Sequence, residues 1–201
     1  MPIVAIIDAI KSREIRRKKR EELIRLIDDI LEKFNKHWKE KLLAKASRTG
    51  GDSIEVLSNN WLSILYLLHT LLIHGIKFRV GLGAGEITIF RENADECDGP
   101  AFWSARKAVD YAKEKKLNGA YQLDRSIQLN EKNDVEKLLL SFALLLKMTK
   151  RQREICYKML WENMTASKIA DDYKITLSNV SISLKRSLCK LLSQVIKNNQ
   201  E

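Results

Sequence analysis

The stretch that decides how this chain folds is residues 149–198, TKRQREICYKMLWENMTASKIADDYKITLSNVSISLKRSLCKLLSQVIKN. Its apolar residues recur at helical spacing in three blocks, and polar turns separate the blocks. The pattern predicts a helix that Thr149 caps, a short helix over 166–173, and a long third helix from Leu177 to about residue 198. Three such helices, with the small Ala170 where the second crosses the third, are typical of a helix-turn-helix that binds DNA.

The positive charge of the chain is concentrated in this last quarter. The formal net charge is +10, and residues 147–201 carry 11 Lys or Arg against 5 Asp or Glu, a surplus of six. The first 146 residues carry 25 against 21, a surplus of four. Cations gathered on the helical tail favour a polyanionic partner such as double-stranded DNA, although charge alone would also suit a membrane surface.

In a helix-turn-helix, the third helix reads base edges with its first exposed residues while cations hold the phosphates. The predicted base contacts are Ser178, Asn179, Ser181 and Ile182. The predicted phosphate contacts are Lys185 and Arg186, with Lys168 from the short helix. A helical module for oligomerisation or protein docking is the alternative, because the apolar stripe of the long helix continues to Val195.

Length and composition are those of a globular protein of one or two domains. The chain has 201 residues, of which 45% are hydrophobic and 31% are charged. No stretch approaches the roughly 18 apolar residues that a membrane span needs. We therefore expect a cytoplasmic protein that does not enter a membrane.

Three cysteines and three histidines are the remaining candidates for special chemistry: Cys97, Cys156, Cys189, His37, His69 and His74. The cysteines are odd in number and their spacing suggests no pairs, which predicts no disulfide or zinc framework and suits a reducing cytosol. The histidines lack partners at metal-binding spacing. We expect them to be core or interface residues rather than ligands.

Residues 1–146 are expected to form a separate domain of alternating strands and helices. The expected strands are 2–8, 41–47, 52–57, 77–90 and 119–123, and the expected helices are 12–38, 60–74, 100–116 and 131–148. Gly81, Gly83 and Gly85 indicate close backbone packing or a bulge. The order predicts an α+β fold of the ferredoxin-like or palm type, with helices against an antiparallel sheet and a hairpin at its centre. An all-α helix-turn-helix domain, residues 147–201, follows it.

Two carboxylates fall where neighbouring strands of such a sheet would bring them together. Asp8 ends the first strand, and Asp52 ends the tight turn RTGGD at residues 48–52. Carboxylate and phosphate oxygens are the ligands that Mg²⁺ or Mn²⁺ needs, and Gly51 would let the backbone approach a phosphate. The alternative is that Gly-Gly-Asp is only a hairpin turn and that Asp8 only caps the next helix.

Four blocks of the first domain resemble the SatD family. They are Ile7-Asp8 with Ser12, Gly51-Asp52-Ser53, FRVGLGAGEI at 78–87, and DGPAFWSAR at 98–106, of which the last is the most specific. The same blocks are similar, more distantly, to class III nucleotidyl cyclases. The RTGGD turn is similar to the hairpin of the diguanylate cyclases.

The cyclase resemblance implies a site for a nucleoside triphosphate and a divalent metal. Under it the metal ligands are Asp8 and Asp52, the nucleotide-binding residues are Ser12, Arg48 and Gly51, and the catalytic residue is Arg106, which would face developing phosphate charge. Two positions depart from the pattern: Phe102 replaces an Asn, and Ser53 replaces the Glu of the diguanylate cyclases. Because a phenyl ring makes no hydrogen bond to a ribose, a cyclase-like fold that binds nucleotide, metal or neither is favoured over an active cyclase.

The start of the tail, TKRQRE at 149–154, and the helices after it are similar to the helix-turn-helix of LuxR-type regulators and of sigma-factor region four. The first hypothesis is therefore a DNA-binding transcription regulator, a homodimer whose N-terminal domain senses a ligand or dimerises. The second is a metal-dependent nucleotidyl cyclase or other phosphoryl-transfer enzyme. The third is an assembly protein with neither activity.

Overall fold

The computed structural model describes residues 1–10, 17–49, 51–123 and 129–197, with the backbone alone at 17, 18 and 129–132. Its contacts divide the chain into two compact units. The first comprises Met1–Leu67 and Ile76–Leu139, and the second comprises Leu68–Gly75 and Leu140–Glu201. Two helices, α2 (Trp61–Ile73) and α4 (Leu129–Lys147), therefore contribute residues to both units. A domain boundary between residues 146 and 147 stays a prediction.

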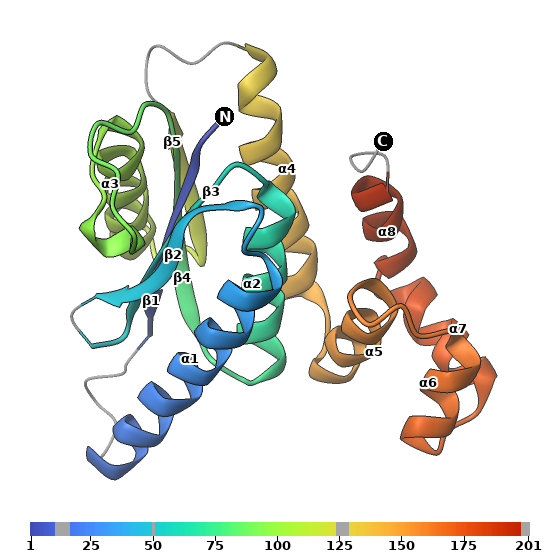
Figure 1. The fold of residues 1–201 in the computed structure, drawn as a ribbon. Coiled ribbons are helices and arrows are strands. Elements are labelled where there is room, and N and C mark those ends of the chain that lie inside the picture. The colour runs from blue at the N-terminus through green and yellow to red at the C-terminus, as the bar shows by residue number, and fades with distance from the viewer. Residues whose placement is uncertain (11–16, 50, 124–128, 198–201) are drawn as a thin grey trace. The chain divides into compact units, whose positions relative to one another are not determined.

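The first unit is built on a mixed five-stranded sheet (Figure 1). Its strands are β1 (Ile3–Ala9), β2 (Leu42–Thr49), β3 (Ser53–Ser58), β4 (Phe78–Ala84) and β5 (Gly119–Leu123). The spatial order is β2-β3-β1-β4-β5. The pairs β2–β3, β3–β1 and β1–β4 are antiparallel, whereas β4–β5 is parallel. The predicted α+β class is confirmed. The predicted antiparallel pairing holds for three of the four strand pairs, but a helical crossover returns β5 parallel to β4. The predicted central position of the hairpin is wrong, because β2 is an edge strand.

Helices cover both faces of this sheet. Figure 1 shows α3 (Pro100–Glu114) on one face, and α1 (Arg17–His37) with the first half of α2 on the other. Successive side chains of β1 point to opposite faces, and Val4 and Ile6 join Phe102 in the buried cluster on the α3 side. A one-turn helix, η2 (Ala94–Glu96), precedes α3. Among the described residues, no helix combines the length and the apolar character that a membrane crossing requires.

Two glycines of β4 let α3 lie against the sheet at close range. A Cβ atom on Gly81 would overlap the backbone of Ala105 and Val109, and one on Gly83 would overlap the backbone of Ala101 and Ala105. The prediction of close backbone packing at these positions is confirmed. It explains why this strand carries glycine at alternate positions on its α3 face.

The fourth strand ends earlier than its sequence predicts. It stops at Ala84 because Gly85 turns the chain with φ 147°. Ile87 is buried after the turn, and Ile89 forms an isolated antiparallel bridge with Asp98. The prediction of one strand through residue 90 is therefore wrong after Ala84.

The second unit is all helical. Besides parts of α2 and α4, it contains α5 (Lys150–Leu160), α6 (Ala166–Tyr173), α7 (Leu177–Arg186) and α8 (Cys189–Lys197). The first two helices of the tail lie where the sequence predicts them. The prediction of one long third helix is wrong, because Leu188 adopts a left-handed backbone conformation, with φ 57°, and separates α7 from α8.

A disulfide closes this unit. Cys156 of α5 is bonded to Cys189 at the start of α8, with their Cα atoms 5.7 Å apart across a sequence separation of 33. The prediction of no disulfide is therefore wrong. Sequence spacing could not reveal the pair because the fold, and not proximity along the chain, brings the two helices together. Cys97 is free and buried.

Candidate functional site

The turn between α6 and α7 fixes how these two helices meet. Lys174 ends α6 in a left-handed conformation, with φ 51° and ψ 47°. The N–H of Ile175 then donates to the carbonyl of Ala170 over 3.0 Å. The hydroxyl oxygen of Thr176 accepts from the N–H of Asn179 at 3.2 Å and begins α7. A three-residue turn of this kind lets two short helices cross closely.

Both helices pack against α5, and α6 also forms polar contacts with it. Nζ of Lys158 lies 3.0 Å from Oδ2 of Asp172, and this hydrogen bond raises the pKa of Lys158. The guanidinium carbon of Arg151 lies 3.5 Å from the ring centre of Tyr173. The apolar interior consists of buried Ile155, Ile169, Ala170, Val180 and Leu184. The inner face of α7 therefore packs against α5 and α6, and its outer face is exposed to solvent.

Every residue predicted to contact DNA is exposed in the structure: Lys168, Ser178, Asn179, Ser181, Ile182, Lys185 and Arg186. Six of the seven lie on α7, and Lys168 lies on the preceding helix. The sequence has no acidic residue between Asp172 and Glu201. The formal charge of α7 and α8 is therefore entirely positive.

The predicted metal ligands lie at one end of the sheet in the first unit. Asp8 of β1 is directly opposite Ser53 of β3, the residue after Asp52. Oδ2 of Asp8 lies 3.4 Å from Nζ of Lys113 in α3. No group of three or more His, Cys, Asp or Glu within the described ranges is arranged to hold a metal ion. A cation here would thus need phosphate or water for its remaining ligands.

The structure describes two of the three predicted nucleotide-binding residues, Arg48 and Gly51. Arg48 donates to both carboxylate oxygens of Asp28, over 2.8 and 3.3 Å, and to the carbonyl of Gly51 over 2.7 Å. The hydrogen bond with Asp28 is the main reason why the pKa of Arg48 is raised. Gly51 has φ 110°, which favours glycine. Ser12 lies outside the described residues.

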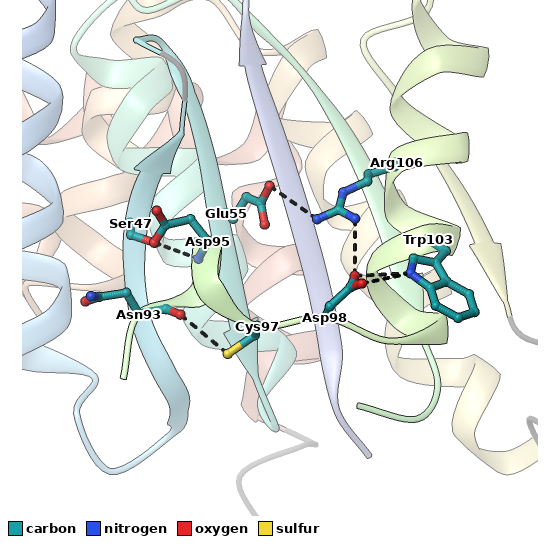
Figure 2. Close-up of polar contacts among 8 residues, drawn as sticks. All are labelled: Ser47, Glu55, Asn93, Asp95, Cys97, Asp98, Trp103 and Arg106. Carbon is teal, nitrogen blue, oxygen red and sulfur yellow. Dashed lines mark hydrogen bonds and ion pairs between the residues drawn. The ribbon is translucent and has the colours of Figure 1, made fainter. Parts of the chain in front are cut away.

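Arg106 is joined to two carboxylates that the sequence did not single out. Its Nη1 lies 3.2 Å from Oδ1 of Asp98, and its Nη2 lies 4.0 Å from Oε1 of Glu55 (Figure 2). Asp98 also accepts from Nε1 of Trp103, over 3.1 and 3.2 Å to its two oxygens. The carboxylate of Asp98, just before α3, thus binds the side chains of Trp103 and Arg106 in the first two turns of that helix. A phosphate contact would require Arg106 to leave this pairing. The signal was present in the sequence, as Asp, Trp and Arg spaced around a helix start within DGPAFWSAR.

Glu55 is a charged residue inside the sheet. It is 6% exposed, and its Oε2 has no hydrogen-bond partner of good geometry. Burial raises the pKa of Glu55, and the carboxylates of Asp95 and Asp98 raise it further against the opposing effect of Arg106. The N–H of Asp95 donates to Oγ of Ser47 over 2.9 Å, which holds η2 beside β2 (Figure 2). Sequence reasoning missed Glu55, since a lone Glu in a short hairpin strand is usually solvated.

Phe102, which departs from the cyclase pattern, is fully buried in the cluster beneath α3. The guanidinium carbon of Arg106 lies 5.9 Å from its ring centre. The ring therefore packs the helix against the sheet and offers no polar group to a ligand.

A search of curated proteins finds no match to this chain. The SatD family model, in contrast, matches residues 3–200, nearly the whole sequence, so the chain belongs to the SatD family.

Proposed function

We propose that this protein is a DNA-binding transcription regulator in which α5, α6 and α7 form a helix-turn-helix. The observation that carries the proposal is the exposed N-terminal part of α7, which follows α6 after a three-residue turn. The exposed side chains there are short and polar, as base-edge contacts require. The positive charge of α7 and α8 supports attraction to the phosphates.

In the proposed complex the start of α7 enters the major groove. Ser178, Asn179 and Ser181 offer hydroxyl and amide groups to base edges, and Ile182 offers an apolar contact to a thymine methyl. Lys185 and Arg186 lie one to two turns further along the helix, where cations meet the phosphate backbone. Lys168 would add a phosphate contact from α6.

Salt-dependent DNA binding tests this proposal directly. Anisotropy of a labelled duplex pool would be titrated at several salt concentrations for the wild type and for the double variant Lys185→Ala/Arg186→Ala. Losing two phosphate contacts should weaken binding to all sequences and reduce the slope of log affinity against log salt by about two. A variant that removes two exposed cations from the other unit, Lys107→Ala/Lys116→Ala, serves as the control because it changes net charge equally. Equal weakening by both variants, or no binding by the wild type, would contradict the proposal.

For the first unit we propose a ferredoxin-like, cyclase-like palm that binds a nucleotide with Mg²⁺ or Mn²⁺. The element order β1-α1-β2-β3-α2-β4 and the strand order β2-β3-β1-β4 support it, since both are those of two interleaved βαβ units. Two carboxylates near one end of the sheet, Asp8 and Asp52, suit a metal that keeps phosphate and water ligands. Bound there, the metal would neutralise phosphate charge. Lys113 already neutralises Asp8, so the metal would compete with this ion pair.

We also propose that the protein acts as a homodimer. A two-fold symmetric regulator reads two half-sites about one helical turn of DNA apart, which doubles the contact surface of a small module. Sedimentation equilibrium of the free protein should give twice the mass of one chain. DNA with paired half-sites should then bind more tightly than DNA with a single half-site.

A second candidate function is metal-dependent phosphoryl transfer on a nucleoside triphosphate. The observation that favours it is the register that sets Asp8 opposite Ser53, beside Asp52. Turnover of ATP or GTP with Mn²⁺, abolished by Asp52→Ala, would support this function. Nucleotide binding without turnover would leave the first unit as a sensor.

A further inference from the structure

Arg20 of α1 is a partly buried cation that pairs with no carboxylate among the residues that the structure describes. Its Nε is buried and has no hydrogen-bond partner. Among the described residues, no carboxylate or carbonyl forms an ion pair or hydrogen bond with its guanidinium. Burying an N–H group without a hydrogen-bond partner is costly, so an acceptor bound beside Nε would stabilise this side chain. The position of Arg20 therefore suits a contact with an anion.

The guanidinium of Arg20 lies at the tip of the β2–β3 hairpin. A Cβ atom placed on Gly51 would be 3.1 Å from its Nη2. Nη1 of Arg48 donates to the carbonyl oxygen of the same glycine over 2.7 Å. Gly51 has φ 110°, so a side chain there would be strained as well as crowded against Arg20. Two guanidinium groups thus converge on one glycine that has no side chain to separate them.

The two arginines differ in whether a carboxylate already pairs with the guanidinium. Asp28 holds Arg48 through both carboxylate oxygens, which orients its guanidinium and neutralises most of its charge. No described carboxylate holds Arg20 in this way. The pair therefore combines an oriented donor, Arg48, whose Nη1 and Nη2 each keep one further N–H, with a cation, Arg20, that no described carboxylate holds. Guanidinium N–H groups of this kind suit phosphate oxygens.

We propose that Arg20 and Arg48 form a phosphate-binding pair that takes the phosphoryl groups of a nucleoside polyphosphate. This inference rests on the proposed nucleotide-binding role of the first unit, and it adds Arg20 and the chemical group that is recognised. Asp52 lies beside the pair and interacts electrostatically with Arg48. A phosphate held by the two arginines would thus lie near the carboxylates proposed for the metal.

Isothermal titration of the full chain with inorganic tripolyphosphate, and separately with ATP, tests the pair. The main variant is Arg20→Gln, which removes the charge of a residue that makes no ion pair within the described ranges, so the fold should survive. It should weaken tripolyphosphate and ATP binding by roughly tenfold or more, while Arg20→Lys should retain part of the affinity. The control is Arg25→Gln, because Arg25 is exposed on the same helix and carries the same charge.

Three results would overturn the inference. They are the absence of binding by either phosphate probe at millimolar concentration, equal losses in Arg20→Gln and Arg25→Gln, and equal affinity for sulfate and tripolyphosphate. DNA affinity measured on the same preparations separates the two proposals. If the protein binds DNA but neither phosphate probe, the proposal of the arginine pair is refuted and the regulatory function stands. If it binds phosphate but not DNA, the regulatory function is refuted and the arginine pair stands.

Discussion

The indole nitrogen of Trp161 lies 3.0 Å from Nδ1 of His69, a residue 92 positions earlier in the chain. An indole N–H can only donate, so Nδ1 must accept and the imidazole proton must be on Nε2. Nε2 in turn lies 3.0 Å from the carbonyl oxygen of Arg153 and donates to it. His69 is fully buried, and burial lowers its pKa to about 3. The prediction of a core histidine is confirmed for His69, a neutral link between α2 and α5 within the second unit, whereas His37 and His74 are exposed.

This link predicts acid sensitivity. The folded-state pKa of His69, about 3, is below its ordinary value of 6.5, so the unfolded chain binds the proton more readily. The stability from the neutral ring is complete above about pH 6.5 and is lost as the pH falls toward 3, at up to about 1.4 kcal/mol per pH unit. The free energy of unfolding, measured with urea at several pH values, should fall less steeply with decreasing pH in His69→Gln than in the wild type. His74→Gln, which changes an exposed histidine next to α2, should keep the wild-type slope.

The indole partner can be tested at neutral pH. Trp161→Phe keeps an aromatic ring but leaves Nδ1 of His69 buried without a donor. We expect the free energy of unfolding to fall by about 1–3 kcal/mol. Urea unfolding at pH 7.5 measures it. Unchanged stability would mean that the hydrogen bond does not form in solution.

The glycines of β4 predict a large steric effect. Gly83→Ala forces a methyl group into the backbone of α3, and we expect a loss of about 2–3 kcal/mol or more. Gly75→Ala is the matched control, because Gly75 has φ 76° and no atom within 4 Å of the added Cβ. It should lose only about 1 kcal/mol, from the left-handed conformation. Thermal unfolding compares the two, and equal losses would contradict the close approach of α3 to the sheet.

Features that depend on local geometry could be predicted from the sequence. The helix cap Thr149 and the alternate glycines of β4 each follow from local geometry, and the structure contains both. The prediction that the first strand and the hairpin are neighbours is confirmed as well, since β1 pairs with β3. These features depend on interactions within one or two elements.

Features that depend on the three-dimensional arrangement could not be predicted. A continuous apolar stripe predicted one long helix, but packing places Cys189 against Cys156 and the chain breaks at Leu188. The pairing of Arg106 with Asp98 and Glu55 joins a helix, a loop and a strand. The burial of Glu55 follows from its place between β2 and β1, which its short strand does not reveal.

Glu55 predicts a pH dependence of the opposite sign to that of His69. Its folded-state pKa is raised by burial, so the folded protein favours the protonated carboxyl. The stability of that form is present at low pH and is lost as the pH rises through the folded-state pKa. Glu55→Gln keeps a neutral side chain of the same shape and should raise stability at pH 8, with the gain shrinking toward pH 4. Glu22→Gln, at an exposed position on α1, should show no such trend. A Glu55→Gln protein less stable than the wild type at pH 8 would mean that the ion pair with Arg106 outweighs the cost of burial.

The cap of α7 connects stability with the proposed DNA contact. Oγ1 of Thr176 accepts from the N–H of Asn179, which starts the helix that carries the predicted base contacts. Thr176→Ala leaves this N–H without its acceptor and should cost about 1 kcal/mol, whereas Thr176→Ser keeps the oxygen and should cost little. Because the first turn of α7 should also fray, the alanine variant should bind DNA more weakly than the serine variant at a temperature where both are folded. Circular dichroism measures the stability of each variant, and duplex anisotropy measures its affinity. If Thr176→Ala lowers stability but leaves affinity equal to that of Thr176→Ser, the start of α7 does not contact DNA and another surface of the unit must.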